Sequence, residues 1–534
     1  MPVTPSDIPA AGSPPILLLT INAKWIHPSL ALRLLKANLG GLEDQCEILE
    51  FALRQPLAEK LEMLRPRRPR ILGISVSIWN HAATVELLEA LERIPACPGA
   101  PARPLVVLGG PEVSYLPPDA EIFRHADYVI RGEGEIPFRE LCGALLSGPG
   151  GQPALAAGPQ LGGSRPFGGP PPGGPRFIDA APAELGALRP AYSYYSGEDL
   201  ARKLVYVESS RGCPFRCEFC MPQGPARPGV REFYLEDFLA EMETLIRRGA
   251  RNFKFLDRSF NYDSKRAIRI MEFFLRHIQV EAGFGGPPAR PLCVHFEMVP
   301  GSFPAELRDL LRRFPPLSLR LEIGIQTLNP QTAALIGRAG DGEAALEVLS
   351  FLSGETGAIV HADLIAGLPG EDLDSFARGF DRLWLALSGP VRQAQDAQGQ
   401  QAQGQDPFTA PDRRVEIQLG ILKLLPGAAI ARHSTAQAMR YNPAPPYEVI
   451  STAALPRSDL DRIKNFARFW EILINRRPFP ELPLAPPGRP VFWSFMKLSG
   501  RLLERFGRNW GIDRRDLRAA VEAETEARCS RIGS

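Results

Sequence analysis

Short apolar runs alternate with helix-like segments in two long blocks of this 534-residue chain. In the first block, the apolar runs lie at 16–21, 46–51, 71–76, 105–108 and 128–130. In the second block, six more lie at 204–207, 252–257, 292–297, 319–326, 359–365 and 415–419. Such alternation predicts parallel sheets covered by helices, with ligands bound at the C-terminal ends of the strands. The predicted fold class is therefore α/β, with a doubly wound (Rossmann-like) sheet followed by a partial (β/α)6 barrel.

Local composition marks the domain boundaries. Residues 148–175 are dense in proline and glycine and cannot bury a core, so they predict a flexible connection. Two further biased stretches, at 282–291 and 393–405, are expected to carry no chemistry. We expect a flexible tail at 1–15, a first ligand-binding domain at 16–147 and a linker at 148–199. The barrel should follow at 200–429, then a small mostly helical C-terminal module at 430–515 and a polar tail at 516–534.

Charge and hydropathy restrict the partners. The formal net charge is only +2, and no basic groove is evident, so nucleic acid is not an expected partner. No apolar run reaches the ~18 residues that a membrane span needs, and the N-terminus lacks a signal pattern, so no membrane partner is expected. Five of the eight cysteines are scattered, which predicts a reducing, cytoplasmic location rather than a disulfide scaffold.

Three cysteines, Cys213, Cys217 and Cys220, form a C-x3-C-x2-C loop directly after an apolar run. Three thiolates on one loop are suited to zinc or to an iron–sulfur cluster. A closed structural zinc site normally needs four ligands, yet the next cysteine is Cys293 and the next histidine is His277. On a four-iron cluster, three cysteines would leave one iron open for a ligand. An incomplete zinc knuckle remains the alternative.

The cysteine loop resembles the signature of the radical S-adenosylmethionine (SAM) superfamily, in which the open iron binds the amine and carboxylate of the methionine part of SAM. The resemblance implies that the three cysteines hold a [4Fe–4S] cluster and that SAM is a second cofactor. Phe219, directly before the last cysteine, would then shield the adenine.

Strand-end residues of the second block complete the expected SAM site. Asp257 would hold the methionine amine as a charge-assisted pair, and Glu297 would suit the ribose hydroxyls. The order Gln326, Arg338, Asp363, with a Gly-Leu-Pro turn after the aspartate, resembles the radical SAM branch typified by the anaerobic coproporphyrinogen oxidase. In that branch these positions contact SAM, with the arginine near its carboxylate. Helix caps, an ion pair between Arg338 and Glu322, and a core position for Phe219 are the plain alternatives.

In the first block, a Gly-Gly-Pro turn and a later Gly-Glu-Gly-Glu follow successive strands. They resemble the cobalamin-binding domain at the N-terminus of one radical SAM class. The resemblance implies cobalamin contacts from His27, Ser75, Ser77, Gly109, Gly110, Pro111 and Glu133. The cobalt-ligating motif Asp-x-His-x-x-Gly is incomplete, because Trp25 and Leu30 hold the Asp and Gly positions. Without an orienting carboxylate, His27 is a poor cobalt ligand, and we expect no protein ligand, or a water, below the cobalt.

Together the resemblances imply a cobalamin-dependent radical SAM methyltransferase. It would act on an unactivated carbon of a small molecule, or on phosphorus, and would need an electron donor of the flavodoxin or ferredoxin type. A non-methylating radical cyclisation or rearrangement and a non-catalytic cobalamin sensor are the alternatives. A methylthiotransferase is disfavoured, because Cys46, Cys97 and Cys142 do not cluster as a second iron–sulfur site would require. Residues 444–452 resemble an uncharacterised C-terminal module of such proteins, and no motif names a catalytic residue or a substrate.

Overall fold

The computed structural model describes residues 14–93, 103–147, 174–221, 229–283, 291–338, 340–388, 415–482, 484–485 and 488–532. Contacts divide the chain into two compact units. The first comprises Met1–Gly212 and Pro222–Lys254, and the second comprises Cys213–Met221 and Phe255–Ser534. The three-cysteine segment therefore belongs to the second unit. In the part of the chain that the structure describes, no helix is long and apolar enough to cross a membrane.

The first unit contains a six-stranded parallel sheet with the order β2-β1-β3-β4-β5-β6. Its strands are β1 (Ile16–Asn22), β2 (Cys46–Ala52), β3 (Ile71–Ser75), β4 (Leu105–Gly109), β5 (Tyr128–Arg131) and β6 (Arg176–Asp179). The chain runs outward from β1 to β2 and then returns to β3 on the other side of β1. This reversal places the ligand crevice of a doubly wound sheet beyond the C-terminal ends of β1 and β3.

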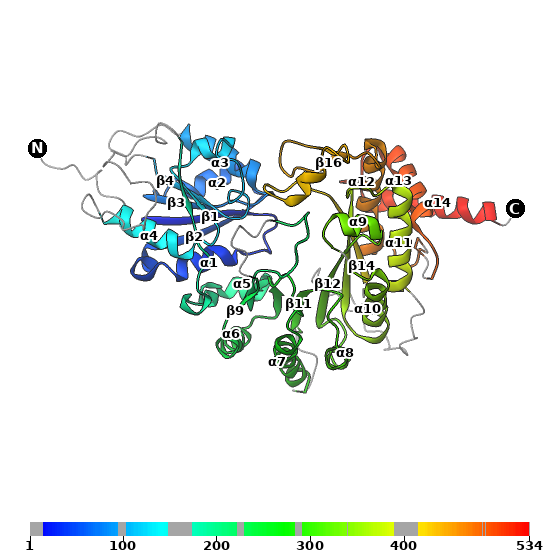
Figure 1. The fold of residues 1–534 in the computed structure, drawn as a ribbon, viewed down its shortest axis with the longest axis horizontal. Helices are drawn as coiled ribbons and strands as arrows, with labels where there is room; N and C mark the ends of the chain where they lie inside the picture. The colour runs from blue at the N-terminus through cyan, green and yellow to red at the C-terminus, as the bar shows by residue number, and fades with distance from the viewer. Residues whose placement is uncertain are drawn as a thin grey trace, which may run out of the picture. The chain divides into compact units, whose positions relative to one another are not determined.

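Helices cover both faces of this sheet (Figure 1). Helices α2 (Leu57–Leu64) and α3 (His81–Glu92) pack on one face, and α1 (Leu30–Ala37) and α4 (Glu135–Leu146) pack on the other. Successive residues of β1 point to opposite faces, so Leu17 and Leu19 join one buried core while Ile16 and Leu18 join the other. Burial on both faces explains why these strands read as nearly continuous apolar runs.

The predicted linker is more structured than its composition indicated. Residues 148–173 lie outside the described part of the chain, but β6 pairs in parallel with β5 and extends the first sheet. Phe177 of β6 packs edge-on against Phe123, with ring centroids 5.2 Å apart. Helix α5 (Gly197–Arg202) follows, and Tyr192 and Tyr195 before it are buried. The first unit therefore continues past residue 147, where the sequence placed its end.

Six further strands form the second sheet, in the order β14-β13-β12-β11-β10-β7. They are β7 (Val205–Val207), β10 (Asn252–Phe255), β11 (Cys293–Met298), β12 (Leu319–Gln326), β13 (Ile359–Ala366) and β14 (Val415–Ile421). Each predicted run is confirmed as a strand. Between them lie α6 (Leu235–Arg247), α7 (Ser264–Gly283), α8 (Ala305–Arg312), α10 (Gly342–Glu355) and α11 (Leu373–Ser388). The α/β class with two parallel six-stranded sheets is therefore confirmed.

Strand β12 shows how this sheet is built. Leu319, Leu321, Ile323 and Ile325 are buried, whereas the alternate residues Arg320, Glu322, Gly324 and Gln326 are only partly buried. One face of the strand is thus apolar, and the other carries polar groups. Figure 1 shows α7, α8, α10 and α11 following one another along one side of β11 to β14.

The chain after β14 forms a helical module with an aromatic core. Its elements are the 3-10 helix η5 (Ala429–His433), β15 (Arg440–Tyr441), β16 (Val449–Ser451), α12 (Arg457–Trp470), α13 (Phe492–Phe506) and α14 (Arg514–Ile532). Phe380 of α11 lies with its ring centroid 5.1 Å from Phe466 and 4.8 Å from Trp470. The predicted polar tail at 516–534 is instead mostly helix α14, which buries Leu517, Ala520 and Val521.

Candidate cofactor sites

The cysteine loop presents two of its three thiols next to arginines. All three cysteines are free and half-buried. The backbone N–H of Cys220 donates to the Cys217 carbonyl at 3.1 Å, which closes a tight turn between these two residues. Arg258 Nη1 lies 3.3 Å from Cys220 Sγ, and Arg338 Nη1 lies 3.5 Å from Cys217 Sγ. Burial raises the pKa of Cys217, and Arg338 partly opposes that rise.

Within the described residues, no three His, Cys, Asp or Glu side chains converge on the position of a single metal ion. A four-iron cluster does not need its ligands to converge on one metal ion, since each of its cysteines binds a different iron. The donor set of three thiols on one loop fits that cluster.

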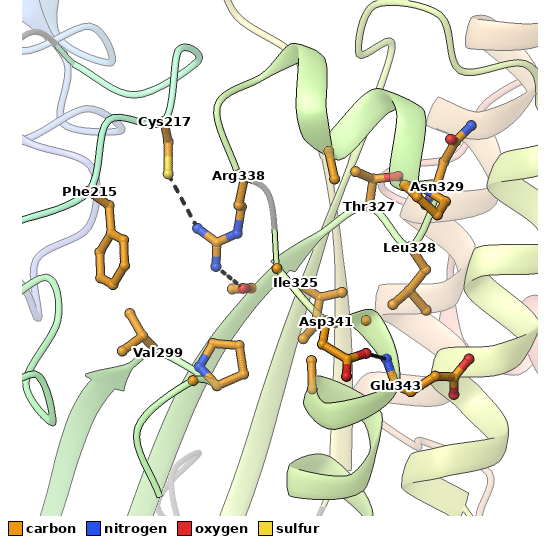
Figure 2. Close-up of a pocket in the computed structure, with 18 of the residues that line it drawn as sticks. Phe215, Cys217, Val299, Ile325, Thr327, Leu328, Asn329, Arg338, Asp341 and Glu343 are labelled. Atoms are coloured by element: carbon orange, nitrogen blue, oxygen red, sulfur yellow. Dashed lines mark hydrogen bonds between the residues drawn. The ribbon is translucent and has the colours of Figure 1, made fainter.

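A cavity of about 460 Å³ adjoins the cysteine loop. Phe215 and Cys217 line it from the loop, Val299 from the end of β11, and Thr327 and Asn329 from the end of β12. Figure 2 shows Arg338 beside Cys217 and Phe215, with Asp341 and Glu343 farther along the cavity. The cavity thus lies at the C-terminal ends of two parallel strands, where barrels of this kind place their chemistry.

Arg338 connects the cysteine loop to the end of β12. Its Nη2 donates to the carbonyl of Gly324, and the same guanidinium donates to Cys217. The pairing register of β12 and β13 shifts between Gly324 and Gln326, where Gln326 has a φ of +69°. Asp363 of β13 pairs with Gly324 in register. The predicted trio of Gln326, Arg338 and Asp363 is therefore gathered around Gly324, although only Arg338 lines the cavity.

The remaining predicted SAM residues do not line the cavity. Asp257 is only 2% exposed, while the next residue, Arg258, is exposed and donates to Cys220. The carbonyl of Glu297 accepts a hydrogen bond from the backbone N–H of Phe260 at 3.0 Å. Phe215, which the sequence reasoning did not single out, lines the cavity in place of Phe219.

Two helix caps and Thr327 line the cavity beyond Arg338, and Thr327 is bonded to a buried acid. Asn329 caps the short helix α9 (Pro330–Leu335), and Asp341 caps α10. Thr327 donates its hydroxyl to Glu371 Oε1 at 2.7 Å. Glu371 is 2% exposed, and burial raises its pKa to about 7. The sequence carried a signal for the caps, namely Asn-Pro and Asp-Gly directly before helical segments, but none for the Thr327–Glu371 pair.

In the first unit, the Gly-Gly-Pro turn packs tightly against the end of β3. Gly110 has a φ of +102°, and a Cβ there would lie 2.6 Å from the Val76 carbonyl, so only glycine fits. Ser114 donates to the Gly110 carbonyl at 2.8 Å and accepts from the Gly132 N–H at 3.1 Å. This serine therefore links the Gly-Gly-Pro turn to the Gly-Glu-Gly-Glu loop.

The strand-end edge of the first sheet also exposes large aromatic rings. Trp79 is 53% exposed after β3, and Trp25 is 44% exposed after β1. Asn80 is fully buried and accepts from the backbone N–H of Ser77 at 2.7 Å, which fixes the loop that carries Ser75 and Ser77. Exposed rings beside glycine backbone fit a large flat ligand.

His27 and Glu133 are each engaged by protein groups. His27 Nδ1 lies 2.8 Å from the Tyr206 hydroxyl, and burial, assisted by two lysines, lowers its pKa. The carboxylate of Glu133 accepts from Arg211 at 3.1 Å and from Arg231. Burial by itself raises the pKa of Glu133, but these arginines and a backbone N–H outweigh it, so the pKa lies below its ordinary value. The two arginines stand on β8 (Ser210–Arg211) and β9 (Arg231–Glu232), the antiparallel pair that flanks the cysteine loop in sequence.

Family models match both parts of the chain. Residues 16–142 match the B12 binding domain, and residues 207–383 match the radical SAM superfamily. The chain thus carries a B12-binding domain followed by a radical SAM domain. Its cofactors are therefore a [4Fe–4S] cluster and SAM for the second part and cobalamin for the first.

Curated relatives of this chain are named as methyltransferases. The cobalamin-dependent radical SAM methyltransferase TokK of Streptomyces tokunonensis is 26% identical over 322 residues, which are 59% of this chain and 45% of that protein. The uncharacterized methyltransferase PH0819 of Pyrococcus horikoshii is 30% identical over 248 residues, 46% of this chain and 51% of that one. The chain thus spans about half the length of these relatives.

Solved structures share the fold. The cobalamin-dependent SAM radical enzyme OxsB, with aqua-cobalamin and SAM bound, aligns with a TM-score of 0.59 at 13% identity, over 97% of this chain and 74% of OxsB. The radical SAM methyltransferase TsrM from Kitasatospora setae aligns with a TM-score of 0.52 at 18% identity, over 80% of this chain and 79% of TsrM. At these identities the likeness establishes the architecture alone.

Proposed function

We propose that this protein is a cobalamin-dependent radical SAM methyltransferase that acts on an unactivated carbon of a small molecule. The observation that carries the proposal is the cavity of about 460 Å³ at the ends of β11 and β12, with Cys217 and Arg338 in its wall. The methyltransferase names of the curated relatives support the type of reaction.

In the second unit, Cys213, Cys217 and Cys220 would hold the cluster. When bound, the cluster and SAM would supply the chemistry that abstracts hydrogen from the substrate, and cobalamin would supply the methyl group. Arg338 lines the cavity, and its guanidinium would receive the SAM carboxylate there as a charge-assisted pair. Phe215 would cover the cavity with an apolar ring and help to exclude water.

The other strand-end residues of the second unit have proposed roles in orienting SAM. Gln326 and Asp363 are strand neighbours of Gly324, whose carbonyl accepts from Arg338, so they would fix the position of that arginine or contact SAM beside it. Asp257 and Glu297 remain proposed contacts for the amine and the ribose. The Thr327 and Asn329 side chains are polar groups of the cavity wall that SAM would meet.

In the first unit, the backbone of Gly109 and Gly110, the ring of Pro111 and the loop of Ser75 and Ser77 would contact cobalamin. His27 would not ligate cobalt, because no carboxylate of an Asp-x-His motif precedes it in sequence to orient the ring. Glu133 would act through Arg211 and Arg231 rather than on cobalamin directly.

Anaerobic reconstitution followed by turnover with methyl-labelled SAM tests the proposal. With a reductant such as dithionite, or a flavodoxin or ferredoxin as the proposed donor, we expect 5′-deoxyadenosine and transfer of label from SAM to the bound corrinoid. If 5′-deoxyadenosine accumulates while the label stays on SAM, methyl transfer is contradicted, and a radical cyclisation or rearrangement takes its place. If a fully loaded protein makes no 5′-deoxyadenosine, the cobalamin-sensor alternative is favoured.

A further inference from the structure

Glu218 lies inside the cysteine loop, between Cys217 and Cys220, and its backbone is bonded on both sides. Its N–H donates to the carbonyl of Ile336 at 2.9 Å, at the end of α9. Its carbonyl accepts from the N–H of Ile430 at 2.9 Å, in η5. The middle of the loop is therefore held between α9 and the C-terminal module.

The side chain of Glu218 is held by the same 3-10 helix. Arg432 Nε donates to Glu218 Oε2 at 2.8 Å, and Arg432 Nη2 donates to the other carboxylate oxygen, which makes a bidentate pair. His433 Nε2 lies 3.0 Å from Glu218 Oε2 and also 3.0 Å from the Leu335 carbonyl. Both of those oxygens can only accept, so Nε2 carries the hydrogen. The side chains of Glu218 and His433 are 12% and 11% exposed.

Arg216, which precedes Cys217 in the loop, is fixed by close packing against Gly337. Gly337 has a φ of +66°, and a Cβ there would lie 2.9 Å from the carbonyl of Arg216. Residue 216 of the loop thus abuts the residue that precedes Arg338, the cavity arginine that donates to Cys217.

Helix η5 is itself anchored in the module. Ile430 is fully buried, and the N–H of Gln437 donates to the His433 carbonyl at 2.9 Å. The Gln437 carbonyl in turn accepts from the N–H of Ala453 at 2.7 Å, just after β16. Val449 of β16 packs against Gly367, at the end of β13, so closely that a Cβ on that glycine would lie 2.5 Å from Val449 Cγ1. This path of contacts joins Glu218 to the second sheet through residues 429–453, which lie outside both family models.

We infer that the C-terminal module positions the cluster ligands by clamping Glu218 through His433 and Arg432. Glu218 and His433 are then positioning residues that set the spacing of Cys217 and Cys220 before the cluster is inserted. Groups that orient metal ligands commonly affect metal retention by about 10- to 100-fold. The inference rests on one part of the proposed function, that the cysteines hold the cluster, and does not depend on methyl transfer.

The test compares cluster retention in Glu218→Ala, His433→Ala and the double variant. Each protein is reconstituted anaerobically with iron and sulfide, and cluster loss to an iron chelator is followed by visible absorbance. We expect at least tenfold faster loss in each single variant. Because the two residues act on each other, we expect the double variant to lie within about twofold of Glu218→Ala. His433→Gln, whose amide N–H can still donate to Glu218, should restore most of the retention.

Two measurements separate positioning from general damage. The electron paramagnetic resonance signal and the midpoint potential of the reduced cluster should shift in Glu218→Ala and His433→Ala, while bound cobalamin, held in the first unit, stays at the wild-type amount. The matched control is the Glu92–His125 pair of the first unit, which has the same 3.0 Å separation. Glu92→Ala and His125→Ala should leave cluster loss unchanged.

Wild-type retention and spectra in Glu218→Ala and His433→Ala would overturn the inference, and so would a double variant whose loss equals the product of the single effects. If the alanine variants lose cobalamin as well, Arg432→Glu decides, since that side chain is 65% exposed and its reversal does not threaten the fold. Wild-type retention in Arg432→Glu would then overturn the clamp. A wild-type protein that takes up no cluster would instead contradict the proposed function.

Discussion

In the second sheet, Arg338 donates to the carbonyl of Gly324, whose strand neighbours are the predicted residues Gln326 and Asp363. At the strand ends of the first sheet, by contrast, two predicted ligands already have protein partners. His27 meets the Tyr206 hydroxyl, and Glu133 meets Arg211 and Arg231. A residue at a strand end is thus reliably placed near a ligand crevice, but its availability to a ligand depends on partners far away in the sequence.

The charges of their partners explain why Glu133 is less available to a ligand than Arg338. Glu133, Glu135 and Glu208 together face Arg211, while Arg231 adds a second cation to Glu133. Partly buried carboxylates of this kind are stable only when they are paired. Arg338 has softer partners, a thiol and a carbonyl, and so retains the capacity to bind an anion.

Replacement of Arg338 tests whether this residue of the second sheet is available to bind SAM. Arg338→Ala removes the cation at the cavity wall, and we expect the dissociation constant for SAM to rise by roughly 10- to 100-fold. Arg338→Lys keeps the charge but not the fork of donors, so its loss should be intermediate. Equilibrium binding of SAM to the reconstituted protein measures both. Unchanged SAM affinity in Arg338→Ala would remove Arg338 from the site.

The buried Glu371 should make stability depend on pH. Because its folded pKa of about 7 lies above the ordinary value of 4.5, its contribution is fully present below pH 4.5 and is lost as the pH rises toward 7. The cost should reach about 3 kcal/mol above pH 7. Glu371→Gln, which cannot ionise, should therefore gain stability relative to wild type between pH 5 and 8 in thermal unfolding. A difference that stays constant with pH would show that Glu371 does not titrate in this range.

Glu133→Gln tests whether this residue of the first sheet serves its arginine partners rather than cobalamin. The substitution keeps the shape but weakens two arginine pairs, so we expect a loss of about 2 kcal/mol in stability, with cobalamin affinity within about twofold of wild type. The folded pKa is lowered, so this stabilisation exists above the ordinary carboxyl pKa and disappears as the pH falls through the folded value. The control is Glu121→Gln, whose side chain is 72% exposed. Weaker cobalamin binding at unchanged stability would make Glu133 a direct cobalamin contact.

His27→Ala should have the smallest effect. It removes one hydrogen bond to Tyr206, worth about 1 kcal/mol. The electron paramagnetic resonance spectrum of reduced, bound cobalamin should show no coupling to a nitrogen of His27. The spectrum of the variant should be the same as that of wild type. Nitrogen coupling that disappears in His27→Ala would make His27 a cobalt ligand after all.

Much of this fold could be predicted from the sequence, because most strands of the two large sheets are rich in apolar residues and are bounded by turn residues. Two elements, β6 and α14, were not predicted, because the apolar pattern there is weak or interrupted. Strand β6 follows a proline- and glycine-rich stretch, and the apolar residues of α14 are sparse among charges. One residue also decides which side chain faces a site. Asp257 is buried, whereas Arg258, at the start of the turn that follows β10, reaches Cys220.

Other parts of the site could not be found by any local pattern. Glu218 and His433 are 215 positions apart, and Thr327 and Glu371 are 44 apart. Their pairing depends on how the strands and the C-terminal module pack, and a spacing rule does not report that. The three cysteines could be identified because all the ligands of the site lie within one short loop.

The most direct test of the central claim compares wild type with Cys217→Ala after anaerobic reconstitution, using SAM and dithionite. We expect about four irons and four sulfides per wild-type chain and formation of 5′-deoxyadenosine. In Cys217→Ala we expect neither a stable cluster nor 5′-deoxyadenosine, with cobalamin content unchanged. A Cys217→Ala protein that still cleaves SAM at the wild-type rate would contradict the assignment of the cysteine loop as the cluster site.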